Sequence, residues 1–133
     1  MNKFLSLFFA LFIVTACDAN VCHEGDTDCK CDSAGICNYT CSGENCTFTA
    51  SGQGDANFDC DDGGCTLTVT SQGDVTLDCE GGNCDVTTTG QGLVTTNCAG
   101  DGCTTNCGGQ GECVINECSD CTCTESTITA VCN

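Results

Sequence analysis

Positively charged side chains are almost absent from this chain. Its 133 residues include two Lys or Arg residues against 19 Asp or Glu residues, so the formal net charge is −17 at pH 7. Proteins that bind nucleic acid draw much of their affinity from Lys and Arg contacts with phosphates, and polybasic segments hold proteins to anionic lipid. We therefore expect no nucleic-acid partner and no electrostatic attachment to a membrane.

Histidine and large apolar side chains are scarce as well. His23 is the only histidine, so it lacks the partners that a hydrolase triad requires. No other catalytic arrangement is present, and we expect that the protein is not an enzyme. The core has few large residues, so crosslinks must supply stability that burial cannot. The large residues at strand positions are Phe48, Phe58, Leu67, Leu77 and Ile115.

A long apolar run occurs near the N-terminus, but it is too short to span a bilayer. Residues 4–14 follow Lys3, which is the arrangement of a secretory signal peptide. The residues VTAC that end at Cys17 resemble a bacterial lipobox. In a lipobox the cysteine receives lipid and becomes the first residue of the mature protein. The alternative is ordinary secretory cleavage after Ala16 or Ala19.

This pattern divides the chain into three parts. We predict a lipoprotein-type signal peptide at residues 1–16, a short anchor linker at 17–21 and a single domain at 22–133. We expect a monomer that leaves the cytosol. It would be either a cell-envelope lipoprotein, held to the membrane through lipid on Cys17, or a secreted protein.

Cysteine is abundant, with 19 residues. Such a density in a short exported chain is typical of a disulfide scaffold. An odd number leaves one cysteine without a partner. Removal of Cys17 from the pool, by lipidation or by cleavage after Ala19, leaves 18 for pairing.

Cysteine also marks a 19-residue period. A second cysteine follows the first by five residues in most units, and a turn with Gln before Gly keeps the same phase. A fixed period near 20 residues is typical of stacked coils, in which each unit packs only against its neighbours. The first cysteines of the units are Cys22, Cys41, Cys60, Cys79 and Cys98, and the second ones are Cys46, Cys65, Cys84 and Cys103.

Within each unit, apolar or small residues alternate with polar ones in two stretches, 46–50 and 56–60 in one unit. This alternation predicts strands with one buried face. The strands could form an antiparallel meander, but nothing would cover its apolar face. Parallel stacking of the units would instead make two facing sheets. We predict this second, all-β fold: a small, flattened, two-sided parallel β-solenoid of about five 19-residue rungs, stapled by disulfides.

The frame also predicts disulfide pairs, because two inward cysteines on facing strands across a short turn lie within bridging range. The end units carry extra cysteines in apolar slots, and after Asn116 the register slips by one residue, which leaves a Cys-rich C-terminal cap. The pairing of Cys22, Cys29, Cys118, Cys121, Cys123 and Cys132 stays open. The predicted pairs are Cys31–Cys37, Cys41–Cys46, Cys60–Cys65, Cys79–Cys84, Cys98–Cys103 and Cys107–Cys113.

Residues 22–116 resemble a bacterial family of exported β-solenoid domains, often lipoproteins, with paired short strands and Gly-rich turns. They also resemble the Cys-x-Gly-Gly-x-Cys repeats of lipoproteins from predatory δ-proteobacteria. Units such as CDDGGC at 60–65 and CEGGNC at 79–84 carry this resemblance. The resemblance implies a solenoid fold and a cell-envelope location, and it implies no activity.

Threonine recurs on the outward side of the first strand of each unit. This pattern resembles the Thr-x-Thr ladder of disulfide-rich insect antifreeze solenoids, and that resemblance implies an ice-binding face. Asp85 and Asn106 interrupt the ladder, and threonine is also a common residue on solvent-facing strands. The candidate face consists of Thr47, Thr49, Thr66, Thr68, Thr87 and Thr89.

Acidic residues recur with the same period, Asp55 with Asp74 and Asp59 with Asp78. Stacked carboxylates repel each other, and Ca²⁺, which prefers oxygen ligands, would relieve the repulsion. The simpler interpretation is a solvated acidic surface that keeps the protein soluble. The sequence thus predicts a non-enzymatic structural or binding module, with Ca²⁺ binding and ice binding as the specific alternatives.

Overall fold

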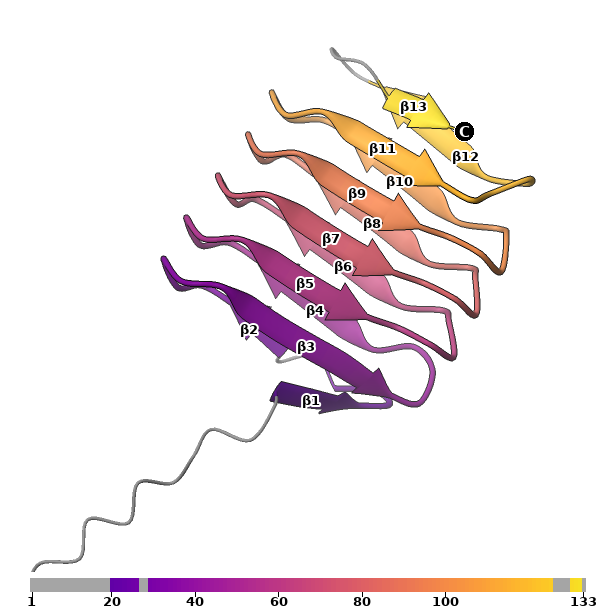
Figure 1. Ribbon diagram of the computed structural model, residues 1–133, viewed down its shortest axis with the longest axis horizontal. Coiled ribbons are helices and arrows are strands. Elements are labelled where there is room, and N and C mark those ends of the chain that lie inside the picture. Colours follow the sequence, from indigo (N-terminus) through magenta and orange to yellow (C-terminus); the bar gives the residue numbers. More distant parts are fainter. Residues whose placement is uncertain (1–19, 27–28, 126–129, 133) are drawn as a thin grey trace, which may run out of the picture.

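The chain winds into a stack of coils, and each coil adds one strand to each of two facing sheets (Figure 1). The computed structural model describes residues 20–26, 29–125 and 130–132. The expected signal peptide and the lipidation site Cys17 lie outside the described residues. No helix long and apolar enough to cross a bilayer occurs in the part of the chain that the structure describes.

Successive strands along the chain belong alternately to the two sheets. The six-stranded sheet consists of β2 (Cys29–Cys31), β4 (Thr47–Ala50), β6 (Thr66–Val69), β8 (Asp85–Thr88), β10 (Thr104–Cys107) and β12 (Thr122–Glu125). The seven-stranded sheet consists of β1 (Asn20–His23), β3 (Cys37–Ser42), β5 (Ala56–Asp59), β7 (Val75–Asp78), β9 (Val94–Asn97), β11 (Cys113–Asn116) and β13 (Ala130–Cys132).

Every strand pair is parallel, and from β1 to β11 the partners lie 19 residues apart. Phe48 pairs with Leu67 and Thr47 with Thr66, so the units stack on themselves and do not form a meander. The predicted two-sided parallel β-solenoid is therefore confirmed. At the C-terminal end the offset falls to 18 residues for β10 with β12, where Thr104 pairs with Thr122. The cap is thus a further coil of the same stack.

The core lies between the two sheets and is built from alternate residues of the strands β2 to β11. Phe48 on β4 and Phe58 on β5 are fully buried, and their ring centroids lie 4.7 Å apart across the coil. The next coil places Leu67 and Leu77 in the same positions, and the later coils use mostly smaller residues, with Ile115 as the exception. The inward alternation follows from the period-two pattern, because successive side chains of a strand point to opposite faces.

Most turns that join the two cysteines of a unit have left-handed backbone at two consecutive residues, whereas the turn at 42–45 has it at Gly43 and Asn45. Gly63 and Gly64 have φ of 82° and 70°, and Gly82 and Asn83 have φ of 74° and 56°. Glycine adopts this conformation without steric cost, and Asn and Asp tolerate it better than other residues. This preference explains why Gly, Asn and Asp occupy the left-handed positions of these turns.

The opposite turns demand glycine for a different reason, which is the close approach of successive coils. A Cβ atom at Gly73 would lie 2.3 Å from the carbonyl oxygen of Gly54, and one at Gly92 would lie 2.1 Å from that of Gly73. These atoms are backbone and cannot move aside. Gln72, which precedes Gly73, is exposed, so its side chain does not have to fit between two coils.

We predict that Gly73→Ala destabilises the solenoid by about 1–3 kcal/mol, because the added methyl group forces two coils apart. Gln72→Ala, one residue away and exposed, is the matched control and should change stability by less than about 0.5 kcal/mol. Denaturant unfolding with the disulfides intact measures both. Equal stabilities for the two variants would show that the coils are not packed this closely.

Candidate functional site

The outer surface of the six-stranded sheet carries a threonine face of two columns. Alternate residues of each strand point outward, and each lies beside its equivalent in the next coil. The side chains are exposed on β6, β8, β10 and β12 and half-buried on β4. One column is Thr47, Thr66, Asp85, Thr104 and Thr122, and the other is Thr49, Thr68, Thr87, Asn106 and Thr124.

The structure extends this face beyond the residues that the sequence indicated. Thr122 and Thr124 lie beside Thr104 and Asn106, although the 19-residue period does not reach them. Their signal in the sequence is the triplet Thr-Cys-Thr at 122–124, which repeats the Thr-x-Thr of earlier units one residue out of phase. Thr89, the remaining expected residue, follows β8 and is exposed.

The threonine face has the regularity of a lattice. Adjacent coils are spaced by about 4.8 Å and alternate residues of one strand by about 6.7 Å. Each position presents one hydroxyl and one methyl group, so the face offers hydrogen bonds and apolar contact at fixed intervals. Asp85 and Asn106 interrupt the two columns in neighbouring coils. Such a face can match a ligand whose own surface repeats at the same intervals.

The four acidic residues expected at a cation site do not form one cluster. Asp55 and Asp74 precede β5 and β7, whereas Asp59 and Asp78 are the last residues of these strands. Asp55 Oδ1 accepts a hydrogen bond of 3.0 Å from the Asp74 backbone N–H, and Asp74 Oδ1 accepts one of 2.9 Å from the Leu93 N–H. Asp55 and Asp74 therefore each hold the turn of the next coil.

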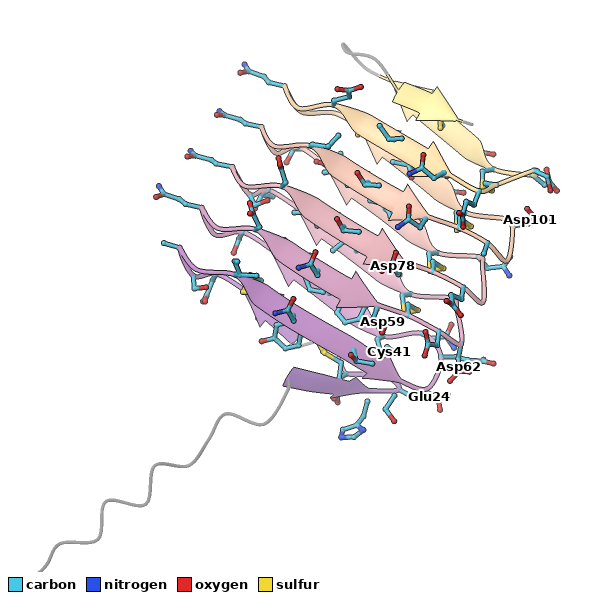
Figure 2. The ribbon with its side chains drawn as sticks, viewed as in Figure 1. Glu24, Cys41, Asp59, Asp62, Asp78 and Asp101 are labelled. Carbon is cyan, nitrogen blue, oxygen red and sulfur yellow. A yellow bond between two sulfur atoms is a disulfide. The ribbon has the colours of Figure 1, made fainter. Side chains whose placement is uncertain are left out.

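Asp59 and Asp78 lie at the edge of an open groove beside the cysteine turns. Figure 2 shows both side chains on the seven-stranded sheet, at the ends of neighbouring strands. The groove has a volume of about 300 Å³, and its acidic lining residues are Asp59, Asp61, Asp78, Glu80 and Glu117. Asp61 and Glu80 belong to the turns that follow the strands, so their approach to Asp59 and Asp78 depends on the conformation of these turns.

In this groove the pKa of Asp59 is raised from 3.8 to about 6. Partial burial of the carboxyl is the largest cause, followed by the hydrogen bond and the charge of Asp61 and then by the charges of Asp78 and Glu80. The negative charge of Asp78 is stabilised by a hydrogen bond that the Asn97 amide donates to its Oδ1. The groove therefore favours uptake of positive charge, either as a proton or as a cation.

Disulfides join cysteines across the turns of every coil. Those of adjacent coils lie close enough that the sulfur atoms of Cys60, Cys79 and Cys84 are all within 4.8 Å of one another, but these sulfurs are bonded and do not form a thiolate metal site. Of the six cysteines whose pairing the sequence left open, four form the pairs Cys22–Cys29 and Cys118–Cys121. The other pairs are Cys31–Cys37, Cys41–Cys46, Cys60–Cys65, Cys79–Cys84, Cys98–Cys103 and Cys107–Cys113.

No protein-family model matches the chain, and no curated protein or solved structure shows significant similarity to it. The resemblance to exported bacterial solenoids and to antifreeze solenoids therefore extends no further than the architecture. The chain is a disulfide-rich parallel β-solenoid of about five turns, and its many disulfides indicate an oxidising location outside the cytoplasm.

Proposed function

We propose that this protein is a non-enzymatic, monomeric binding module of the cell envelope, and that its threonine face binds an ordered surface, with ice as the ligand. The observation that carries the proposal is the register of the six-stranded sheet. Over β4 to β12, threonine occupies all but two of the outward positions in the two columns.

Two further features support this function. The disulfides and the tightly packed turns make the coils rigid, so the hydroxyl and methyl groups are held in position before the ligand arrives, which lowers the entropic cost of binding. From β4 to β12 the face carries no Lys or Arg, and it presents short branched side chains with few rotamers to order. Lys30 on β2 lies beside Thr49, at the N-terminal edge of the face. A structural spacer would need the rod alone and would not need a repeated chemical pattern on one side of it.

We predict that the mature protein inhibits ice recrystallisation and that Thr68→Lys abolishes the inhibition. Lysine at this central position adds a long charged side chain, which would keep the face from approaching a flat surface. The matched control is Thr76→Lys, which places the same charge on β7 of the opposite sheet and should retain full inhibition. Equal inhibition by the two variants, or none by the wild type, would contradict ice binding.

Attachment to the membrane is a separate part of the proposal. The lipobox-like sequence before Cys17 and the odd number of cysteines support lipidation at this residue. Lipid on Cys17 would hold the solenoid at the membrane surface, joined through a linker of a few residues. The threonine face and the acidic groove would then both be presented outside the cytoplasm.

We predict that Cys17→Ser abolishes lipidation and leaves the disulfides of the solenoid unchanged. Metabolic labelling with a palmitate analogue measures the lipid, and mass spectrometry of the unreduced protein counts the disulfides. Labelling of the variant at the wild-type level would show that the lipid, if present, is attached elsewhere.

A second candidate function is Ca²⁺ binding in the acidic groove, and the raised pKa of Asp59 favours it. A carboxyl that resists ionisation because of neighbouring carboxylates gains stability when a cation neutralises them. Asp59, Asp61, Asp78 and Glu80 would supply the oxygen ligands. Asp55 and Asp74 would contribute less, because each already accepts a backbone hydrogen bond.

We predict that Asp59 titrates with a midpoint near pH 6 and that Ca²⁺ lowers this midpoint, as followed by carboxyl ¹³C NMR. The folded chain binds this proton between pH 3.8 and about 6 and the unfolded chain does not. The free energy of unfolding should therefore fall as the pH rises through this window.

Asp61→Asn tests the cause of the shift. The substitution removes the neighbouring charge and should move the Asp59 midpoint toward 3.8 while it weakens the effect of Ca²⁺. A wild-type midpoint near 3.8 would show that the carboxylates do not interact strongly. A midpoint near 6 that Ca²⁺ leaves unchanged would exclude a cation site in the groove.

A further inference from the structure

The Cys118–Cys121 disulfide differs from the other crosslinks that the structure describes. Its two cysteines are three residues apart in the sequence, whereas those of the neighbouring Cys98–Cys103 disulfide are five apart. Both Cys118 and Cys121 are half-buried, while Cys98 and Cys103 are buried. A small molecule in solution can therefore reach the sulfur atoms of Cys118 and Cys121 more easily than those inside the stack.

The Cys118–Cys121 disulfide also lies beside the Cys98–Cys103 disulfide of the preceding coil. The sulfur atoms of Cys98, Cys118 and Cys121 all lie within 4.8 Å of one another. The arrangement arises because the Cys-x₄-Cys turn of earlier coils is shortened to Cys-x₂-Cys in the last coil, and the shorter turn still stacks on the turn before it. A thiol released at Cys118 or Cys121 would be formed beside a buried disulfide.

The turn between the two cysteines is held in place by Asp101. The backbone N–H and the hydroxyl of Ser119 each donate a hydrogen bond of 2.9 Å to Asp101 Oδ1. These bonds lower the pKa of Asp101, so its carboxylate stays ionised. Figure 2 shows Asp101 on the cysteine turn of the preceding coil. The Gly102 N–H also donates a hydrogen bond of 3.0 Å to the carbonyl oxygen of Asp120.

We propose that Cys118–Cys121 is a thiol–disulfide exchange site, at which a low-molecular-weight thiol without negative charge becomes attached to the protein. The thiolate of the small molecule attacks one sulfur of the disulfide, a new mixed disulfide forms, and the other cysteine leaves as a thiolate that takes up a proton. Electrons balance within this exchange, so no further oxidant or reductant is needed. The site is a modification site at the C-terminal end of the solenoid, apart from the threonine face.

The charges around the disulfide select the kind of thiol. Glu117 and Asp120 directly flank the two cysteines in the sequence, and Asp101 is bonded to the turn between them. An attacking thiolate already carries negative charge, and a second negative group on the same molecule adds repulsion, while an ammonium group offsets it. The site therefore favours cationic thiols over neutral ones and neutral thiols over anionic ones.

The contact with Cys98 gives the released thiol a second reaction. A free thiolate at Cys118 lies within reach of the Cys98 sulfur. Its attack would form a Cys98–Cys118 disulfide and release Cys103, again without net oxidation or reduction. Thiol–disulfide exchange at Cys118–Cys121 would thus be passed on to the buried disulfides through Cys98.

The first test treats the folded mature protein with limiting amounts of three probes: cysteamine, 2-mercaptoethanol and 2-mercaptoethanesulfonate. Free cysteines are then alkylated and located by mass spectrometry. Each rate is divided by the rate of the same probe with bis(2-hydroxyethyl) disulfide, which removes the intrinsic reactivity of the thiol. We expect modification first at Cys118 and Cys121, with cysteamine about fivefold faster than 2-mercaptoethanol at low salt, a difference that high salt reduces.

Two outcomes of this test would overturn the proposal. One is first modification at another pair, for example Cys31–Cys37, in which Cys37 is also half-buried. The other is equal normalised rates for the three probes. Asp101→Asn is the matched variant for the charge effect, because Asn tolerates the positive φ of 63° at this position. It should keep Cys118–Cys121 as the first site and narrow the difference between cysteamine and 2-mercaptoethanesulfonate.

The second test uses Cys121→Ser, which leaves Cys118 as a thiol beside Cys98. We expect alkylation of this variant to label both Cys118 and Cys103, because the thiol moves between them by exchange. A label on Cys118 alone would disprove the transfer to the stack. The wild-type probe experiment does not depend on this variant, so the exchange site itself remains testable if Cys121→Ser folds poorly.

Discussion

The constraint on which the whole structure depends is the close approach of each coil to the one before it. The backbone must return to hydrogen-bonding distance of itself every 19 residues, on both sheets and at both turns. The glycine turns allow this because a Cβ atom at Gly73 or Gly92 would collide with the preceding coil. The cysteine turns allow it through left-handed residues such as Gly63, Gly64 and Asn83. Any residue that separates two coils weakens both sheets at once.

Disulfides supply what the small core cannot. Along the axis the core residues change from Phe48 and Phe58 through Leu67 and Leu77 to mostly smaller ones, with Ile115 in a later coil. Thr96 and Thr105 are buried, and their hydroxyls have no hydrogen-bond partner among the described residues, at a cost of about 1–3 kcal/mol each. A disulfide that closes a loop as short as the one between Cys60 and Cys65, which are five residues apart, stabilises the fold by about 2 kcal/mol in the chain-entropy model. The crosslinks in each coil can therefore offset a core that is thin and partly polar.

The period that stacks the core also stacks the surface, and this produces both candidate sites. Threonines at one position of each unit become a column on the outer face, whose regular spacing no single coil could provide. Carboxylates at another position become a column of like charges. The protein accommodates some of these charges locally, through backbone bonds at Asp55 and Asp74 and the Asn97 amide at Asp78. Asp59 has no such relief and keeps a raised pKa.

The sequence by itself determined the length of a coil, the inward and outward sides of its strands and the stacking of like residues, because each of these follows from a regular period. It left the pairing of Cys22, Cys29 and the last four cysteines open. It missed Thr122 and Thr124, since the last coil shortens its turn and breaks the period on which the prediction relied. It also gave the same role, that of candidate cation ligands, to all four stacked aspartates. Only the tertiary structure separated Asp55 and Asp74, which hold turns, from Asp59 and Asp78, which share a groove with Asp61 and Glu80. Those contacts depend on turn conformation and on which strand end a residue occupies, and a repeat pattern carries neither.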